Sequence, residues 1–399
     1  MKKGCIILLT LIMIVPLAGC WSRRELNDLA IAVGLAIDKT GKNEYLISVQ
    51  VVDPSEVTPK QGGGGRAPVT VYQQKANTVF EGLRKITTIA PRKIYLSHLR
   101  ILVLGEAVAK EGIGKSLELL SRDHEIRSDF FIVLAKDTSA SSILKFISPL
   151  EKIPAQKLYK SLEVSQKAWA PTHTIQLDEL IASMTSDGKE AVLTTVMYTG
   201  TKKIGGTKTN VEQVKAAAHL QYFRLAVLRK DKLVGWLSEK ESKGFSYISS
   251  EVKSTVGKLA CPKKGWLVIE IFNANAKVKA RLHNGKPKID IYSSLEANIG
   301  EVRCDVDLTK AKTIDELEKI FAQHNREILM SAVKKAKRLK SDIFGFGEAI
   351  HRTSPKTWEK LKKDWNTKGF VNVPVEIHVD AKIRRTGRMN KSYLEDLKE

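Results

Sequence analysis

The chain has 399 residues, of which 43% are hydrophobic, so it is long enough for two or three domains with cores of their own. Its net charge of +22 favours acidic partners, such as nucleic acid or an anionic membrane surface. Four cysteines are too few for a small fold held together by disulfides.

The first twenty residues have the pattern of an export signal. Two lysines precede an apolar run at 6–15, which is shorter than the roughly 20 residues that span a membrane. The stretch ends in Leu17-Ala18-Gly19-Cys20, which resembles a bacterial lipobox. We therefore expect residues 1–19 to be a signal peptide that is removed, and Cys20 to carry a diacylglyceryl group. An ordinary secretory signal that happens to end in cysteine is the alternative.

Such a tether would hold the mature chain at a membrane surface. An exported chain of this charge meets anionic lipid headgroups before it meets nucleic acid, so we expect a membrane-lipid partner and no nucleic acid. A general surface preference for lysine is the alternative explanation of the charge.

Strands and helices alternate in the first half of the chain. Residues 29–38 and 45–52 predict a hairpin, and four glycines at 62–65 predict an exposed loop. Further strands are expected at 69–73, 99–104, 129–135 and 191–199, with helices at 78–89, 106–121, 139–147, 154–169 and 175–184. Such alternation requires crossover connections, so residues 20–200 are expected to form an α/β region, of one or two subdomains, with a partly parallel sheet.

The second half predicts a different architecture. Residues 201–210, rich in Gly, Lys and Thr, are expected to be a linker to an α+β domain at 211–399. Hairpins are expected at 220–237 and, around the strong turn signal Asn284-Gly285, at 267–303. An amphipathic helix at 313–339, a short helix at 355–363 and a strand at 371–383 follow. We expect an antiparallel sheet packed on the long helix.

Five cations crowd the end of this long helix: Lys334, Lys335, Lys337, Arg338 and Lys340. Cations at a helix C-terminus interact favourably with the helix dipole, which is one explanation. Contact with anionic lipid headgroups or with a partner is the other, and the sequence leaves both open.

A glycine- and phenylalanine-rich stretch, 342–347, follows the helix. Its glycines would let the chain turn, and its phenylalanines would hold the turn to the core. A surface loop that meets a partner is the alternative role. The candidate residues for either role are Asp342, Phe344, Gly345, Gly347, Trp358 and Trp365, with the two tryptophans expected in the core or at the rim of the last helix.

No enzyme signature stands out. Gly112–Ser116 resembles the end of a phosphate-binding loop, but position 109 is Ala and the run lies within a predicted helix. The eight histidines show no metal-binding spacing. We therefore expect no catalytic activity, no metal and no cofactor.

Several landmarks together carry a resemblance to a known family. They are Gly19–Leu26 after the signal, Leu99–Leu104 ahead of Ser121–Arg127, and Asp342–Gly347 ahead of Pro355, Trp358 and Trp365. The chain resembles the Ger(x)C family, the C-subunit lipoproteins of spore germinant receptors, over essentially its whole mature length. Ser22 departs from the acidic residue that the family often carries there, which leaves the lipobox undisturbed.

The resemblance implies a place and a role. The chain would lie on the outer face of the cytoplasmic membrane, the inner membrane of the spore, with a multi-span A subunit and a transporter-like B subunit in a nutrient receptor. It implies a mixed α/β fold and no catalytic residue. A lipid-anchored solute-binding or cell-wall-associated lipoprotein is the alternative, but the halves differ in pattern and no paired carboxylates or zinc cluster can be placed.

Cys261 and Cys304 are expected to be separate thiols. A two-residue turn at Asn284-Gly285 pairs Cys304 with Gly265, four residues from Cys261. Along an extended strand this offset is about 13 Å. Because a disulfide needs Cα atoms within about 7 Å, the sequence predicts no bond between them.

Overall fold

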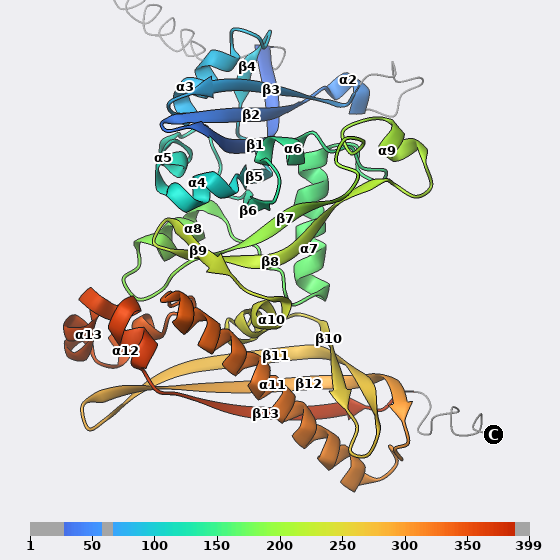
Figure 1. The fold of residues 1–399 in the computed structure, drawn as a ribbon, viewed down its shortest axis with the longest axis vertical. Coiled ribbons are helices and arrows are strands. Elements are labelled where there is room, and N and C mark those ends of the chain that lie inside the picture. Colours follow the sequence, from blue (N-terminus) through green and yellow to red (C-terminus); the bar gives the residue numbers. More distant parts are fainter. Residues whose placement is uncertain (1–27, 58–66, 388–399) are drawn as a thin grey trace, which may run out of the picture.

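The computed structural model describes residues 28–57 and 67–387, so the predicted lipidation site Cys20 lies outside the described residues. Two sheets form the body of the molecule and follow one another along its long axis (Figure 1). The first is flanked by helices, and the second lies against one long helix. The predicted fold class, an α/β region followed by an α+β region, is confirmed.

Within the described part of the chain, the N-terminal sheet has nine strands in the order β3-β2-β1-β5-β6-β7-β8-β9, with β4 paired to β1. They are β1 (Leu29–Gly41), β2 (Glu44–Val52), β3 (Val69–Ala76), β4 (Lys93–Tyr95), β5 (Ile101–Leu104), β6 (Phe131–Lys136), β7 (Val192–Gly200), β8 (Ala218–Arg229) and β9 (Lys232–Trp236). The strands β1, β5, β6 and β7 run parallel, with antiparallel pairs on either side. The predicted partly parallel sheet is therefore confirmed.

Helices pack on both faces of this sheet, because its central strands are apolar on both sides. Alternate residues along these strands belong to two separate cores. Leu102 and Leu134 pack into one, and Val103 and Val133 pack into the other. The first core includes residues of α3 (Val79–Ile86), α4 (Glu106–Glu111), α5 (Gly114–Arg122) and α8 (Leu177–Thr185), and the second includes α6 (Ala140–Leu144) and α7 (Pro154–Ala168). Two short helices, α2 (Pro54–Val57) and α9 (Thr209–Glu212), complete this half.

The C-terminal sheet has the order β10-β11-β12-β13, with bounds Thr255–Ala260, Gly265–His283, Lys286–Cys304 and Val375–Arg385. Asn284 and Gly285 join the two long strands with φ of 50° and 73°, as the predicted two-residue hairpin requires. One strand differs from the antiparallel expectation, because β13 runs parallel to β12. The chain reaches β13 by a long crossover that contains α11, as parallel neighbours require a crossover connection.

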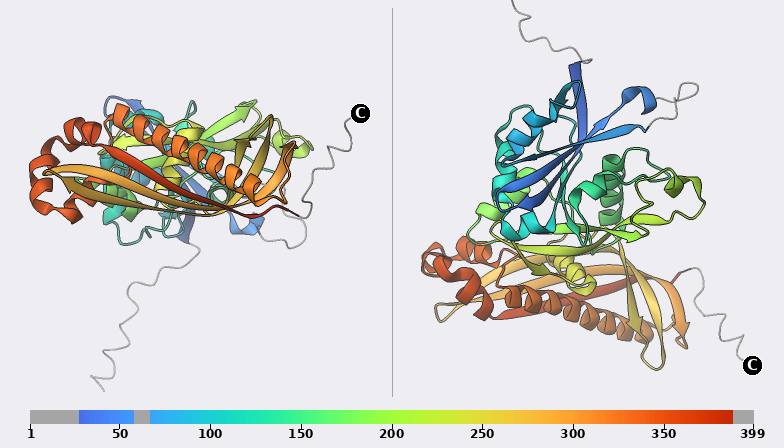
Figure 2. Two further views of the ribbon diagram at one scale, coloured as in Figure 1. Left: turned by 90° about the horizontal axis from the view of Figure 1, so that it is seen from below. Right: turned by 45° about the horizontal axis from the view of Figure 1, so that its top comes forward.

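The long helix α11 (Ala311–Leu339) packs across this sheet and shares its core (Figures 1 and 2). It begins at Ala311, two residues before the predicted start at 313. The helix α10 (Glu239–Ile248) crosses α11 on the side of the N-terminal sheet. At one end of the sheet lie α12 (Phe346–Thr353), α13 (Pro355–Leu361), the 3-10 turn η3 (Lys362–Asp364), the π turn η4 (Trp365–Gly369) and α14 (Phe370–Asn372).

The N-terminal sheet continues past the expected linker. The hairpin of β8 and β9, which the sequence analysis assigned to the C-terminal domain, pairs with β7 and completes the nine-stranded sheet. A hairpin signal is local and does not say which sheet the hairpin joins. The division of the chain at 201–210 stays a prediction.

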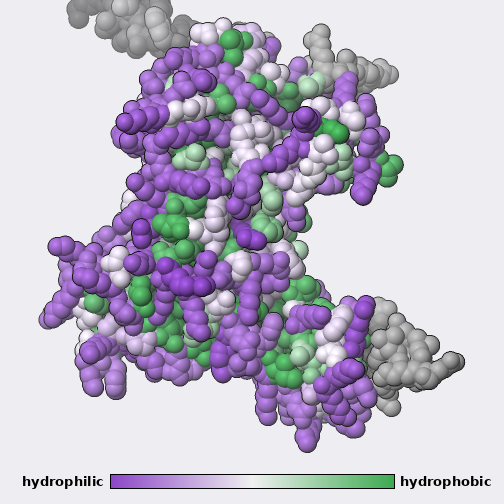
Figure 3. Space-filling model, in the orientation of Figure 1, coloured by the Kyte–Doolittle hydropathy of each residue, from purple (hydrophilic) through white to green (hydrophobic). Residues whose placement is uncertain are grey.

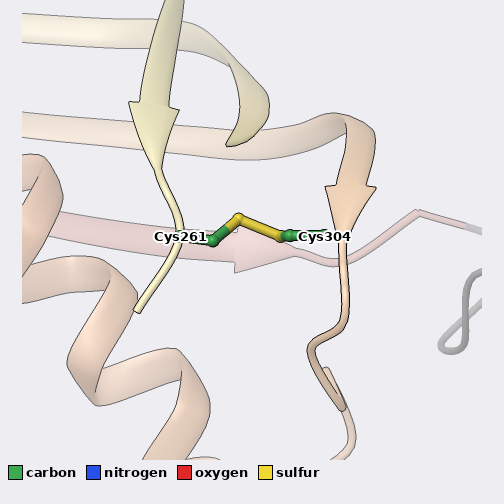
Figure 4. Close-up of a disulfide and its surroundings, with 2 residues drawn as sticks. All are labelled: Cys261 and Cys304. Carbon is green, nitrogen blue, oxygen red and sulfur yellow. A yellow bond between two sulfur atoms is a disulfide. The ribbon is translucent and has the colours of Figure 1, made fainter. Parts of the chain in front are cut away.

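Cys261 and Cys304 form a disulfide, with Cα atoms 6.4 Å apart, so the prediction of separate thiols is wrong (Figure 4). The predicted register is correct, because Cys304 lies opposite Gly265. The error was to treat residues 261–265 as extended. Instead the chain reverses at 262–264, and the Cys261 N–H donates to the Gly265 carbonyl at 3.2 Å. Both cysteines therefore lie beside Gly265.

The surface fits a chain rich in lysine and arginine. Hydrophilic residues cover most of the face in Figure 3, and hydrophobic ones gather mainly in its lower half, over the C-terminal sheet and α11. Among the residues described, no helix is both long and apolar enough to cross a membrane.

Candidate functional site

Asp342 is the centre of the turn that follows α11. Its buried carboxylate accepts four hydrogen bonds, from the backbone N–H groups of Phe344 (3.3 Å), Phe346 (3.1 Å) and Gly347 (2.8 Å) and from the indole N–H of Trp365 (2.8 Å). Burial raises the pKa of Asp342 to about 6, although these donors act in the opposite direction. The carboxylate thereby satisfies the first N–H groups of α12, which have no partner inside the helix.

The same turn contacts the N-terminal half of the chain. The N–H of Glu190 donates to the Asp342 carbonyl at 2.8 Å. Asn366 joins the two, donating to the Glu190 carboxylate at 2.6 Å and accepting from the Asp342 N–H at 3.0 Å. The Ser341 hydroxyl donates to the Leu228 carbonyl at 2.6 Å. Burial also raises the pKa of Glu190. We call Glu190, Leu228, Ser341, Asp342 and Asn366 the domain junction.

The two glycines of the turn are needed for different reasons. Gly345 has φ of +72°, in the left-handed region that favours glycine. Gly347 lies inside α12, and a Cβ there would be 2.6 Å from Trp358 Cη2 and 2.7 Å from Gly188 Cα. The backbone conformation at Gly345 is thus one that glycine adopts without strain. At Gly347 the close approach of Trp358 and of the Gly188 backbone excludes a side chain.

Trp358 and Trp365 belong to the core. Both are buried, and their rings meet edge to face with centroids 5.4 Å apart. Phe344 stacks on the buried Phe346 with centroids 5.3 Å apart. The six residues that the sequence singled out around 342–365 are thus gathered in one place, most of them away from solvent.

The five cations at the end of α11 have different surroundings. Lys337 donates to the Val373 carbonyl at 2.6 Å, and burial lowers its pKa. Arg338 pairs with Glu241 of α10 at 3.6 Å. Three of the cations make neither an ion pair nor a side-chain hydrogen bond within the described part of the chain: Lys334, Lys335 and Lys340. These three side chains are therefore the ones whose charge no contact inside the described chain offsets.

A cavity of about 550 Å³ lies between the two halves, with Glu190 and Ile343 in its wall. His173 and Glu251 face one another in it, with Nδ1 and Oε2 2.5 Å apart, and the His173 ring lies edge-on to Phe245 at 5.5 Å. Further lining residues are Gln166, Glu179, Ser183, Lys189 and Glu348. No local motif marks this site in the sequence, because its residues are far apart in the chain.

The His173–Glu251 pair places a carboxylate beside an imidazole. A carboxylate beside an imidazole can orient it for proton transfer. Among the described residues, however, no serine, threonine or cysteine side chain is hydrogen-bonded to the His173 ring. What the pair does is link the N-terminal half to the segment that follows α10.

Three possible metal ligands lie together on β12 and β13. Asp290, Glu376 and His378 have ligand atoms within 4.8 Å of one another. The two carboxylates already pair with the protein's own cations, Asp290 with Arg281 at 3.1 Å and Glu376 with Lys288. These cations would compete with a metal ion, so the cluster does not by itself indicate a metal centre.

Two family models match the chain in succession. A spore germination protein N-terminal domain matches residues 22–197, and the spore germination B3/GerAC-like C-terminal domain matches residues 224–387. Spore germination protein KC of Bacillus subtilis is 30% identical over 100% of this chain and 99% of its own. Spore germination protein A3 of the same organism is 23% identical, over 96% and 97% of the two chains.

The fold is also known from a solved structure. The crystal structure of the GerBC protein matches with a TM-score of 0.53 at 19% identity, covering 88% of this chain and 96% of its own. At this identity the match shows the fold alone, while the match to protein KC extends over the whole chain. The resemblance that the sequence motifs carried is thereby confirmed: the chain belongs to the spore germination B3/GerAC-like family.

Proposed function

We propose that this chain is the lipoprotein subunit of a spore germinant receptor, required for nutrient-triggered germination and without catalytic activity of its own. The observation that carries the proposal is that both halves match germination family models, with a germination protein related over the whole length. The subunit would act through assembly with the integral-membrane A and B subunits.

A deletion tests the proposal directly. Spores that lack the gene should germinate slowly with particular nutrients, while vegetative growth stays normal, and the intact gene should restore the response. Tagged protein should co-purify with the A and B subunits from spore membranes. A growth or transport defect with normal germination would contradict the proposal.

The anchor is proposed to be lipid on Cys20, at the outer face of the cytoplasmic membrane. One acyl chain holds a protein only marginally, whereas two or three hold it firmly. Cys20→Ala should therefore be released from membranes or remain unprocessed, and the wild-type N-terminal peptide should carry a lipid adduct in mass spectrometry. Normal membrane retention of the variant, with no adduct on the wild type, would refute this anchor.

The turn that follows α11, with the two tryptophans and the domain junction, is proposed to be structural rather than a partner surface. Support comes from the burial of Asp342, Gly347, Trp358 and Trp365 and from the hydrogen bonds that join the turn to Glu190. By fixing the two halves relative to each other, the turn would present the partner subunits with a single body.

Lys334, Lys335 and Lys340 are proposed to approach anionic headgroups. In the Cys20→Ala chain, reversing these three charges to Glu should weaken binding to phosphatidylglycerol vesicles, and added salt should weaken the wild-type interaction. Reversal of Lys312 and Lys319, near the other end of α11, is the control. An equal loss in the control would show that net charge alone accounts for binding.

The 550 Å³ cavity is the observation that favours the alternative, a lipid-anchored solute-binding protein. Its wall carries four glutamates, so a cationic solute would suit it best. Saturable binding of such a solute, lost in Glu190→Gln and accompanied by a transport defect, would favour this function over the receptor.

A further inference from the structure

A second, smaller cavity lies within the C-terminal half. It has a volume of about 270 Å³ and lies between α10, α11, β10 and β11. We call it the helix crevice. It is separate from the domain junction and from the cavity that contains His173, and neither the sequence motifs nor the family matches assign it a role.

The backbone explains why this space is open. The helices α10 and α11 are in close contact at Gly244, where a Cβ would lie 2.6 Å from the Ile328 carbonyl oxygen. On the sheet side, Gly257 takes the inward position of β10 between Thr255 and Leu259, both of which are buried. A Cβ on Gly257 would meet Ile269 at 3.5 Å, an ordinary contact distance. A side chain at 257 would therefore extend into the crevice over Ile269 and Ile271.

The crevice has an apolar floor and a cationic rim. Ile269, Ile271, Phe321 and Ile328 form the floor. The titratable residues that line the crevice are Lys240, Lys243, Lys258, His324, Tyr247 and Glu239. Glu239, the one acidic residue among them, lies 3.4 Å from Lys243. Net positive charge around an apolar floor suits a ligand with an apolar body and an anionic head.

A buried polar residue is also part of this lining. Asn325 is 1% exposed, and its Oδ1 has no hydrogen-bond partner among the described residues. Buried amide groups are nearly always hydrogen-bonded, because an unpaired one costs about 1–3 kcal/mol. Rotation of the amide turns either its oxygen or its NH2 toward the crevice, so Asn325 can pair with a donor or an acceptor on a ligand.

The electrostatics of the rim agree with an anion. Burial lowers the pKa of His324, and the charges of Lys240 and Lys243 lower it in the same direction, while Glu327 opposes them. The imidazole thus experiences positive surroundings, which an anionic head would relieve.

We propose that the helix crevice binds an amphipathic anion, with an aliphatic chain on the isoleucine and phenylalanine floor and a carboxylate or phosphate at the lysine rim. At about 30 Å³ for a water-sized group, the volume holds about nine such groups. A medium-chain fatty acid such as octanoate has this size. A free fatty-acid anion and the acyl end of a membrane lipid share this chemistry.

Octanoate is the first probe, titrated into the purified full chain by calorimetry. Gly257→Leu should fill the crevice and weaken binding at least tenfold without lowering the melting temperature. Gly300→Leu is the matched control, because that glycine is exposed on the same sheet and a Cβ there meets only the Val268 carbonyl at 3.6 Å. The control should bind octanoate as the wild type does.

A second variant keeps the test decisive if Gly257→Leu misfolds. Lys240 is exposed, so Lys240→Glu should fold normally and weaken octanoate binding severalfold, whereas the exposed Lys253→Glu outside the crevice should not. Neutral octanol should bind more weakly than octanoate. No binding of octanoate to the wild type, or equal binding to the wild type and both crevice variants, would overturn the proposal.

The same variants distinguish the two sources of the anion. If phosphatidylglycerol vesicles bind in a manner that depends on Gly257, the crevice takes a membrane acyl chain. If octanoate binding alone depends on Gly257, the ligand is a free carboxylate. Either result supports the crevice as a site for an amphipathic anion.

Discussion

The most informative single substitution in the domain junction is Asp342→Asn. Each carboxylate oxygen of Asp342 accepts two N–H groups, Oδ1 from Phe344 and Phe346 and Oδ2 from Gly347 and Trp365. Asparagine replaces one oxygen by NH2 and leaves two buried donors without an acceptor. At about 1–3 kcal/mol for each, the free energy of unfolding should fall by about 2–6 kcal/mol at neutral pH.

The loss of stability in Asp342→Asn should depend on pH, because the pKa of Asp342 is raised in the folded protein. Folded Asp342 keeps its proton up to about pH 6, whereas the unfolded chain has the ordinary value of 3.8. The stabilising contribution of the protonated group is therefore fully present below about pH 4 and is lost as the pH rises through 6. Over this window it amounts to about 3 kcal/mol. Asparagine does not titrate, so the stability gap between wild type and variant should widen on acidification.

Urea unfolding followed by tryptophan fluorescence, at about pH 7.5 and about pH 4.5, measures both effects. The exposed Asp380→Asn is the control and should change stability by no more than about 0.5 kcal/mol. If the free energies of unfolding of wild type and Asp342→Asn differ by less than about 1 kcal/mol at neutral pH, the hydrogen bonds of Asp342 are not worth what we infer. If the difference becomes smaller on acidification, the inferred rise in the pKa of Asp342 on folding is refuted.

Two further predictions concern the turn and the disulfide. Gly347→Ala should lower the free energy of unfolding by about 1–3 kcal/mol, because the added Cβ has no space. Gly345→Asn should lower the melting temperature less than Gly347→Asn, because asparagine tolerates the positive φ at 345. Wild-type melting of Gly347→Ala would contradict the close packing. Replacing Cys261 and Cys304 with Ser should cost about 4 kcal/mol, since their bond closes a loop of 43 residues. A non-reducing peptide map should show the crosslink, and alkylation of both thiols without reduction would contradict it.

Local signals in the sequence determined much of the C-terminal sheet. Asn284-Gly285 fixed the hairpin and its pairing from the turn to the pair of Asn273 and Glu296, because a two-residue turn with positive φ leaves one way to pair the strands. Beyond that pair, two compensating irregularities at 268–273 shift the register by one residue and restore it, so that Gly265 again lies opposite Cys304. The long helix was equally visible, because its apolar residues repeat with the helical period. Both features depend on residues that are near one another in the chain.

The candidate site was visible only in part. The sequence pointed to Asp342, Gly345 and Gly347, since glycines beside a polar residue after a helix indicate a turn. It gave no sign of Glu190 or Asn366, whose side chains bond to each other across the two halves of the chain. Nor did it show that Gly345 is needed for its positive φ and Gly347 for lack of space, because the space at Gly347 is limited by Gly188, which is distant in the sequence.

The sequence by itself therefore determined the family, most of the longer strands and helices, and the turn of the long hairpin. It did not reveal the strands β4 and β10. Only the tertiary structure decided which sheet β8 and β9 join, how β13 runs and that Cys261 meets Cys304. The disulfide shows the physical reason. A reversal of three residues at 262–264 turns an expected separation of about 13 Å into a Cα distance of 6.4 Å, and such a reversal is stabilised by strand pairing with β11 rather than by its own sequence.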